Sequence, residues 1–322
     1  MITSLKRFFE QNLPETLIQR LMPVRIAIAR IVRAIFSALG YNVTRKNDYY
    51  APLPNLKSLQ NNAARWQKAS SLPGIDYDLG AFKTLLRELT QSYTQELTQL
   101  PAYPRVQKMG FGPGYTAIDA QSLYMIIRQF KPARYIEIGS GISTYYCHLA
   151  AKKNRADGYP LQIECIEPYP YAALTALPGI QLQKQEVQNI DPAYFEQLTR
   201  NDILFIDSSH VLKIDGDVAY LYLEILPRLK PGVLIHIHDI PFPYNYPYPP
   251  EFWINAAPWP KYWNEAMVLQ AFLAFNASFQ VILSTPLLRY FDEPFLRQTF
   301  LNYQPVTVEP NTFSSIWLQR VR

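Results

Sequence analysis

The sequence predicts an α/β fold, in which an open and mostly parallel sheet is covered by helices on both faces. Three observations predict it. Short apolar segments rich in β-branched residues recur along residues 135–240, with room for a helix between them. Several of these segments end in glycine or a charged residue, as strands do at the ligand-binding edge of such a sheet. The chain has 322 residues, of which 48% are hydrophobic and 18% charged, so one large domain with an appendage is expected.

Cysteine content and charge limit the class of protein further. Cys147 and Cys165 fall on a predicted helix and a predicted strand, so we expect reduced core residues and a cytoplasmic protein. Residues 1–110 contain 15 Lys and Arg against 7 Asp and Glu, whereas the remainder contains 16 against 19. A nucleic-acid enzyme would have its basic face beside its active site. Nucleic acid is therefore not an expected partner.

Residues 18–39 have the pattern of an amphipathic helix. Arg20, Arg30 and Arg33 lie beside or opposite its apolar stripe, and they interrupt any run long enough for a signal peptide or a membrane span. The stripe consists of Leu21, Val24, Ile28, Ile31, Val32, Ile35 and Leu39. Two interpretations follow: contact with an anionic membrane surface, or packing against its own domain or a second subunit of a homo-oligomer. We favour packing against protein, because amphipathic helices mostly face a core.

Further helices are expected over residues 55–68 and 79–100, and a glycine-rich turn at 110–115 leads into another helix over 118–130. The predicted organisation is a helical N-terminal extension over residues 1–108 and an α/β domain over 109–322.

The segment 134–150 organises the α/β domain. A short buried strand, Tyr135 to Ile138, is followed at once by Gly139 and Gly141, and Ser143 or Thr144 is expected to cap the next helix. Such a turn brings the backbone and free N–H groups close to a ligand. Thr144 stands where a dinucleotide fingerprint has its third glycine. Glu137 would repel a pyrophosphate but suits a ligand with an ammonium group.

Acidic and histidine residues follow the other predicted strands. Glu167 ends the second strand, where a carboxylate can accept hydrogen bonds from a ribose diol, and Gln188 follows the third. The fourth strand ends in Asp207, which precedes His210, and the fifth ends in His238 and Asp239. Because the carboxyl ends of parallel strands meet at one edge, these residues predict a single site.

The stretch from Glu137 to Gly141 (Glu-Ile-Gly-Ser-Gly) resembles motif I of the class I S-adenosylmethionine-dependent methyltransferases. Ile206-Asp207-x-x-His210 and Asp239 resemble a bacterial branch that includes the macrocin O-methyltransferases and the cephalosporin-hydroxylase-like proteins. The resemblance implies a Rossmann-like seven-stranded sheet, mostly parallel with an antiparallel last strand. It also implies S-adenosylmethionine as cofactor, held by Glu137, Gly139, Ser140, Gly141, Ser143, Glu167, Gln188 and Asp207.

The implied reaction is methyl transfer, most simply to an oxygen of a small-molecule, peptide or saccharide acceptor. His210 is the expected general base, because an imidazole titrates near working pH, and Asp207 and Asp239 are expected to orient it or the acceptor. Some relatives hold magnesium with the fourth-strand Asp and two acids after the fifth strand. Here the pair is His238-Asp239, so we assign no metal, although Asp207, His238 and Asp239 form a rival metal-binding arrangement.

Three further expectations complete the prediction. Tyr115 and Asp119, just before motif I, are second-rank site residues, because this segment often closes over the cofactor in the family. The segment 241–263, rich in Tyr, Pro and Trp, is expected to cover an acceptor pocket. Two alternative functions stay open: a nicotinamide-dependent oxidoreductase and a cofactor-binding scaffold without activity.

Overall fold

The computed structural model describes residues 14–44, 48–256, 259–303 and 313–322. These divide at Asn62/Ala63 into two compact units. The first unit carries α2 (Glu15–Ala38) and α3 (Leu56–Asn61). None of the helices within the described ranges is both long and apolar enough to cross a bilayer.

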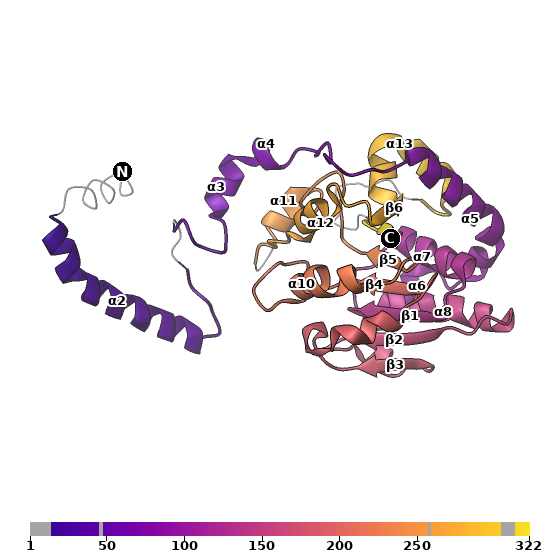
Figure 1. Ribbon diagram of the computed structural model, residues 1–322, viewed down its shortest axis with the longest axis horizontal. Coiled ribbons are helices and arrows are strands. Elements are labelled where there is room, and N and C mark those ends of the chain that lie inside the picture. The colour runs from indigo at the N-terminus through magenta and orange to yellow at the C-terminus, as the bar shows by residue number, and fades with distance from the viewer. Residues whose placement is uncertain (1–13, 45–47, 257–258, 304–312) are drawn as a thin grey trace. The chain divides into compact units, whose positions relative to one another are not determined.

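The second unit is built on a seven-stranded sheet with the order β3-β2-β1-β4-β5-β7-β6 (Figure 1). β7 is antiparallel to both β5 and β6, and the other neighbouring pairs are parallel. The strands are β1 (Arg134–Ile138), β2 (Gln162–Ile166), β3 (Ile180–Gln183), β4 (Ile203–Ile206), β5 (Leu234–Ile237), β6 (Phe279–Ser284) and β7 (Ile316–Arg320). The predicted seven-stranded, mostly parallel sheet with an antiparallel last strand is confirmed.

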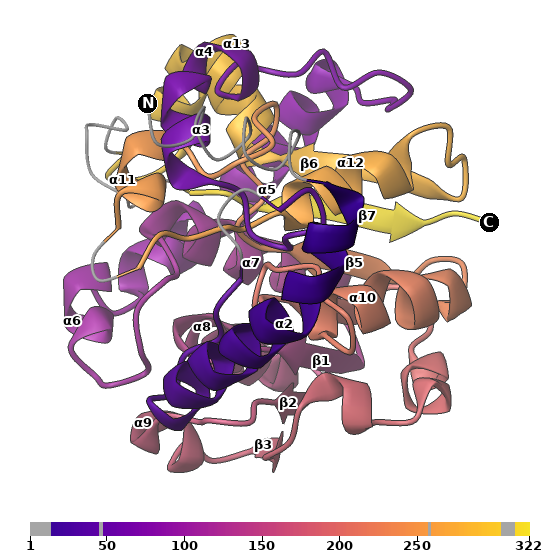
Figure 2. The ribbon, with the colours of Figure 1, turned by 90° about the vertical axis from the view of Figure 1, so that its left-hand side faces the viewer.

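Helices cover both faces of this sheet, which explains why β4 and β5 are buried along their whole length. α5, α7 and α8 lie on one side, and α10 and α12 lie on the other (Figures 1 and 2). The helices of the unit are α4 (Ala63–Trp66), α5 (Leu79–Gln99), α6 (Tyr103–Gln107), α7 (Ala117–Phe130), α8 (Ile142–Ala156), α9 (Ala172–Thr175), α10 (Asp217–Tyr220), α11 (Pro250–Ile254), α12 (Glu265–Leu273) and α13 (Thr285–Thr299).

α5 belongs to the compact core of the second unit, although two further helices, α6 and α7, separate it from motif I in the sequence. Asp78 caps its N-terminus by accepting hydrogen bonds from two backbone N–H groups, and Phe82, Leu86 and Leu89 are fully buried. The predicted domain boundary at residues 108/109 stays a prediction. The packing shows that α5, on the N-terminal side of that boundary, shares the core of the α/β domain.

One local prediction differs from the structure. α8 begins at Ile142 with Gly141 as its N-cap, so Ser143 and Thr144 lie inside the first turn, where Thr144 Oγ1 accepts a hydrogen bond from the Gly141 N–H at 3.1 Å. The helical segment after β4 is broken into α10, a π-helical turn (Leu221–Ile225) and a 3-10 turn. The short helix α6 and the long helix α13 had no individual sequence prediction.

Candidate functional site

The glycine turn after β1 closely approaches the end of β4. Gly139 has a φ of +75°, and a Cβ atom built there would lie 1.8 Å from the carbonyl oxygen of Asp207. A Cβ on Gly141 would lie 2.8 Å from the carbonyl oxygen of Phe111. Only glycine fits both positions without a backbone shift, so the sequence Gly-Ser-Gly is required by the contact between β1, β4 and the segment before α7.

Glu137 is fully buried behind this turn. Ser143 Oγ donates a hydrogen bond to its carboxylate, and Thr144 Oγ1 donates another at 2.6 Å. Burial raises the pKa of Glu137 to about 8, although the two hydroxyl donors oppose the shift. Glu137 and Ser143 therefore bind each other and hold the start of α8 against β1, whereas the sequence placed both among the cofactor ligands.

A cavity of about 320 Å³ opens at the carboxyl ends of β1, β2 and β4. Four of the predicted cofactor residues line it: Gly139, Glu167, Gln188 and Asp207. Glu167 accepts hydrogen bonds from the backbone N–H groups of Ser140, at 3.2 Å, and Tyr169, at 2.7 Å. This carboxylate thereby joins the glycine turn to the loop after β2, and it faces the cavity from between them.

Unpartnered polar atoms show that the cleft fits a polar ligand. Ser140 Oγ, Ser208 Oγ and Gln188 Oε1 are buried and have no hydrogen-bond partner among the described residues. Gln188 also donates to Glu186 at 3.0 Å, which fixes its amide in the wall of the cavity. Buried polar atoms are nearly always paired, so these three fit a ligand that supplies donors and acceptors, as a nucleoside does.

His210 is the centre of a second cluster, at the ends of β4 and β5. Its Nε2 lies 3.2 Å from Asp207 Oδ1 and 3.4 Å from Asp239 Oδ2, and its Nδ1 lies 2.8 Å from Glu265 Oε2. The ring also packs on Trp263, with 4.5 Å between centroids. Both ring nitrogens thus face carboxylate oxygens, so both act as donors when the ring is protonated.

These contacts determine the charge of His210. Burial by itself would lower its pKa, but the hydrogen bonds to Asp207 and Glu265 and the charge of Asp239 outweigh burial and raise the pKa to about 10. An imidazolium at neutral pH has no lone pair to accept a proton. The geometry therefore favours a role for His210 other than the expected general base.

His238 lies on the other side of Asp207. Its Nε2 is 3.4 Å from Asp119 Oδ2, while its Nδ1 lies 3.4 Å from Asp207 Oδ1 and 3.6 Å from Asp239 Oδ1. Tyr115 covers the ring, with centroids 4.9 Å apart. The second-rank residues Tyr115 and Asp119 thus contact the site through His238, and Asp119 orients the imidazole from behind.

Asp239 and His210 share an unusual backbone. Their φ values are +56° and +60°, in the left-handed region that non-glycine residues seldom adopt. Ser314 Oγ donates to Asp239 Oδ1 at 2.8 Å and fixes that carboxylate. The surroundings thus hold two strained residues in place, as is common where side chains must point into a site.

Asp207, His238 and Asp239 each present one ligand atom, and these atoms lie within 4.8 Å of one another. His238 Nδ1 is buried and has no hydrogen-bond partner in the described part of the chain, and Asp119 holds the other ring nitrogen, which is the usual support for a metal-binding histidine. The three residues therefore fit a divalent cation. Without one, the protonated histidines neutralise the carboxylates and, although burial opposes it, hold the pKa of Asp207 well below its usual range.

Several residues of this cluster had no prediction from the sequence. Glu265 is buried. Besides contacting His210, it accepts a hydrogen bond at 3.1 Å from the hydroxyl of Tyr222, a residue of the π-helical turn. Ser314 supplies the hydroxyl that donates to Asp239. A lone carboxylate at the start of the apolar segment 265–273 was the available signal for Glu265, but no local pattern connects it with His210, 55 positions away.

The aromatic segment 241–263 reaches the cluster at its end. Trp263 contacts His210, and Trp253 of α11 packs on Trp263 with 4.8 Å between centroids. Tyr244 and Tyr248 stack at 4.5 Å. Residues 257–258 of this segment lie outside the described residues.

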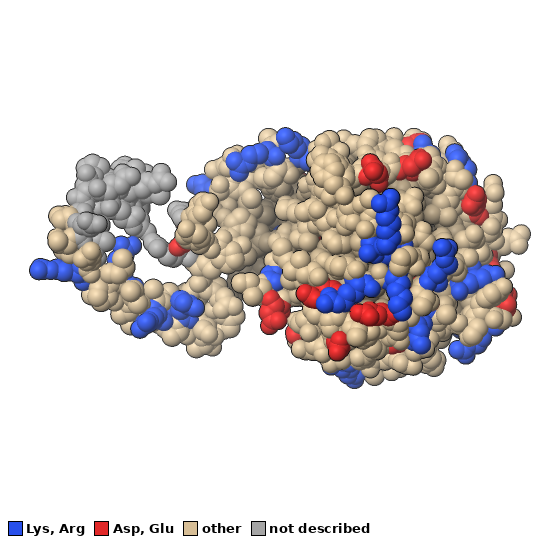
Figure 3. Space-filling model, in the orientation of Figure 1, with Lys and Arg blue, Asp and Glu red and all other residues tan. Residues whose placement is uncertain are grey.

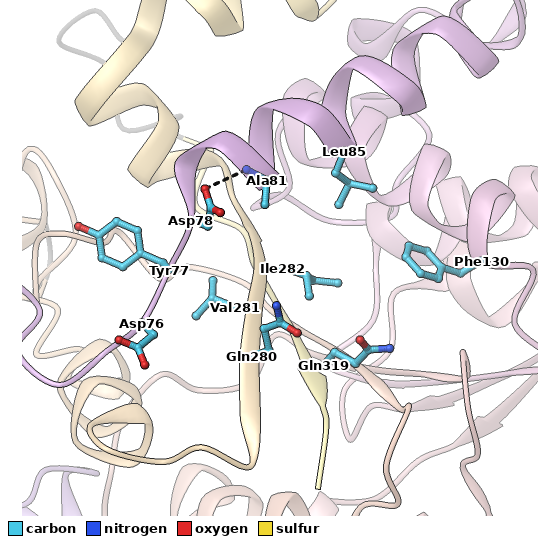
Figure 4. A pocket seen from close by; sticks show the side chains of 10 residues that line it. All are labelled: Asp76, Tyr77, Asp78, Ala81, Leu85, Phe130, Gln280, Val281, Ile282 and Gln319. Atoms are coloured by element: carbon cyan, nitrogen blue, oxygen red, sulfur yellow. Dashed lines mark hydrogen bonds between the residues drawn. The ribbon is translucent and has the colours of Figure 1, made fainter.

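A separate cavity of about 420 Å³ lies between α5 and the edge strand β6 (Figure 4). Its only charged lining side chains within the described ranges are Asp76 and Asp78, and Asp78 is occupied in capping α5. This cavity contains none of the predicted site residues.

Comparison with known proteins agrees with this geometry. A family model described as a methyltransferase domain matches residues 136–240, which include the glycine turn and the ends of β2, β4 and β5. An uncharacterised protein from Archaeoglobus fulgidus is 30% identical over 169 residues, which cover 48% of this chain and 73% of the archaeal one.

Solved structures resemble the chain more distantly. A methyltransferase from Podospora anserina bound to S-adenosylhomocysteine is 15% identical, covering 85% of this chain and 100% of its own, with a TM-score of 0.36. A putative O-methyltransferase from Klebsiella pneumoniae is 14% identical over 74% and 99% of the chains, with a TM-score of 0.41. The O-methyltransferase TomG from Streptomyces achromogenes, in complex with S-adenosylmethionine, is 14% identical over 77% and 91%, with a TM-score of 0.40. At TM-scores below 0.5 these likenesses add nothing to the family assignment.

The fold defines an α/β protein whose ligands bind at the carboxyl edge of the sheet. The family match defines it further: residues 136–240 of the chain are a methyltransferase domain. The alternative of a nicotinamide-dependent oxidoreductase is not favoured. The narrower resemblance to the macrocin and cephalosporin-hydroxylase-like branch stays a prediction.

Proposed function

We propose that the enzyme transfers the methyl group to a hydroxyl oxygen of its acceptor, which binds at the ends of β4 and β5. One observation supports this most: Asp207 belongs both to the cofactor cleft and to the carboxylate–histidine cluster. The methyl donor and the group that handles the acceptor's proton are therefore neighbours. Holding the two reactants in this geometry is the main requirement of an in-line displacement.

Each residue of the site has a separate role in this reaction. S-adenosylmethionine, when bound, supplies an electrophilic methyl group. Asp239, fixed by Ser314, accepts a hydrogen bond from the acceptor hydroxyl and takes its proton as the oxygen–methyl bond forms. His210, protonated between Asp207, Asp239 and Glu265, helps to keep Asp207 ionised. Glu167 and Gln188 hold the cofactor from the walls of the cleft, and Ser140 holds Glu167 through its backbone N–H.

A divalent cation held by Asp207, His238 and Asp239 would supply positive charge that favours the deprotonated form of the acceptor hydroxyl, an alkoxide or phenoxide. The two arrangements predict different responses to chelation. Turnover that resists EDTA but is lost in Asp239→Asn supports the carboxylate base. Turnover abolished by EDTA and restored by magnesium assigns the metal arrangement instead.

The cofactor assignment has its own test. Titration calorimetry with S-adenosylhomocysteine and with NAD should show binding of the first alone. Binding of NAD in preference would reverse the assignment, and binding of S-adenosylhomocysteine without turnover on any hydroxylated acceptor would favour a scaffold without activity.

The acceptor is proposed to be a small molecule, a peptide or a saccharide bound under the aromatic segment 241–263. Trp263 links this segment to His210, and stacked aromatic rings suit flat or apolar acceptors and sugar faces. Shortening the segment should raise the Michaelis constant for the acceptor while the affinity for S-adenosylhomocysteine stays nearly constant. An equal loss of cofactor affinity would show that the segment is part of the fold rather than a cover.

We further infer that α2 lies on an anionic membrane surface. Its apolar side chains are exposed, and basic side chains follow the helix (Figure 3). Within its 24 residues, α2 has four arginines (Arg20, Arg25, Arg30 and Arg33) and one acidic residue, Glu15. Pairing α2 with its copy in a second subunit would bring like charges together, whereas an anionic lipid surface complements them. This reverses the preference that the sequence pattern alone suggested.

Flotation with vesicles tests this inference. The protein should float with phosphatidylcholine vesicles that contain phosphatidylserine, and Arg30→Glu/Arg33→Glu should remain at the bottom of the gradient. Flotation that is absent, or unchanged in the double variant, would contradict the lipid surface. A dimer in light scattering that the same double variant dissociates would assign α2 to a homo-oligomer.

A further inference from the structure

Arg289, in the second turn of α13, has no ion-pair or hydrogen-bond partner among the residues that the structure describes. Its guanidinium lies over the ring of Phe313, with 4.9 Å from Cζ to the centroid. Its Nη1 is buried and has no hydrogen-bond partner among the described residues. No carboxylate in the described ranges comes within ion-pair distance of it. Stacking on Phe313 satisfies the flat face of the group but leaves its N–H donors unused.

Such an arrangement is costly unless something completes it. Burial lowers the pKa of Arg289, and the acidic groups that act on it, Asp119 and Glu293, are already bound elsewhere. Asp119 accepts from Thr116 and Ser315, and Glu293 accepts from Tyr303. A buried charge is normally paired, and a guanidinium matches the two oxygens of a carboxylate or a phosphate.

The fold places Arg289 beside the proposed reaction centre. β5 and β6 are both antiparallel to β7, so β6 ends, and α13 begins, at the same edge of the sheet as β4 and β5. Phe313, under the guanidinium, directly precedes Ser314, which holds Asp239. Tyr290, next to Arg289 on α13, contacts Tyr244 of the aromatic segment at 5.9 Å. The guanidinium thus stacks on the residue that precedes Ser314, and its helix neighbour Tyr290 contacts the aromatic segment.

We propose that Arg289 binds an anionic group of the acceptor, so that the substrate carries an acidic oxyanion as well as the hydroxyl that is methylated. This rests on the proposed function for the location of the acceptor, but binding of the anion does not require turnover. Arg289 is then a specificity-determining residue: it selects acidic acceptors and sets their orientation against Asp239.

The test uses the full chain saturated with S-adenosylhomocysteine, with small aromatic anions as probes. Benzoate or phenyl phosphate should bind in titration calorimetry and raise the melting temperature, whereas the neutral benzamide should do neither. Arg289→Met should weaken binding of the anion at least about tenfold, because the paired N–H donors of the planar guanidinium are lost. Arg297→Met is the matched control, since Arg297 lies on the same helix, is exposed and pairs with Glu293 at 3.5 Å. It should bind as the wild type does.

The two probes distinguish a carboxylate from a phosphate as the preferred group. Equal affinity of wild type and Arg289→Met for both anions, or binding of benzamide as tight as that of benzoate, would overturn the proposal. Should Arg289→Met fail to fold, Arg289→Lys keeps the positive charge but cannot donate two parallel hydrogen bonds. It is expected to bind the anion more weakly than the wild type. Unchanged binding in Arg289→Lys would count against bidentate recognition. A failure of the proposed function appears separately, as absent binding of S-adenosylhomocysteine.

Discussion

The candidate site lies along the carboxyl edge of the sheet, and its β1–β2 half and its β4–β5 half are built in different ways. On the β1–β2 side, the hydrogen bonds that shape the cleft span 7 positions, from Thr144 to Glu137, and 27 positions, from Ser140 to Glu167. On the β4–β5 side, His210 meets Glu265 across 55 positions, and Asp239 meets Ser314 across 75. The proposed cofactor half is therefore closed by hydrogen bonds within residues 137–167, whereas the proposed acceptor half needs more distant segments to fold together.

The largest effect is expected at the turn on which the cofactor half depends. Gly139→Ala places a methyl group against the carbonyl oxygen of Asp207 and should weaken S-adenosylhomocysteine binding by more than about a hundredfold in calorimetry. Gly179→Ala is the control, because Gly179 has a similar φ of +79° but open space around its Cβ. Equal effects of the two variants would show that backbone strain, rather than the close approach, matters.

A smaller loss is expected from Glu167→Ala. Removing the carboxylate that joins the glycine turn to the loop after β2 costs the charge-assisted bonds to the ribose, on the order of 1.5–3 kcal/mol in S-adenosylhomocysteine binding. The exposed Glu196→Ala serves as control. An unchanged dissociation constant in a folded Glu167→Ala would remove Glu167 from the cofactor site.

On the β4–β5 side, the pKa of His210 should depend on its long-range contact with Glu265. Glu265→Gln removes one of the carboxylates around His210 and should lower the pKa of that imidazole from about 10, by about one unit or more, in a histidine NMR titration of EDTA-treated protein. Binding of S-adenosylhomocysteine should not change. Glu251→Gln, an exposed position on α11, is the control. A pKa that stays near 10 in Glu265→Gln would show that Asp207 and Asp239 alone set the charge.

The last prediction concerns stability. Glu137 has a folded-state pKa of about 8, above the ordinary carboxyl range, so its bound proton stabilises the fold fully below that range. This contribution is lost as the pH rises through about 8. The free energy of unfolding of the wild type should fall relative to Glu137→Gln between pH 5 and pH 9, by up to about 1.4 kcal/mol per pH unit. Glu88→Gln, at an exposed position, should show no such trend, and parallel curves for wild type and Glu137→Gln would refute the buried proton.

The same contrast explains what the sequence could predict. Apolar segments and local spacing predict the glycine turn after Ile138 and strands within residues 135–240, and the structure has them there. The seven-stranded sheet with an antiparallel last strand was implied by the resemblance to the methyltransferases, and it is confirmed. The roles of Glu137 and His210 could not be predicted, because both depend on burial and on partners. Glu137 is enclosed by Ser143 and Thr144, and His210 gains its charge from Asp207, from Glu265, which lies 55 residues away, and from Asp239. Residue type and spacing do not report either environment.

One feature of the sheet has a consequence for biosynthesis. β7 inserts between β5 and β6, and the residues just before it supply the hydroxyls that hold Asp239 and Asp119. On the ribosome, β7 is made after every other described strand and helix. β6 thus has no partner in the sheet, and the reaction centre no fixed carboxylate, until β7 has left the exit tunnel. A nascent chain that has already formed its cofactor cleft would thus still be inactive, so methyl transfer cannot begin before synthesis has passed this strand.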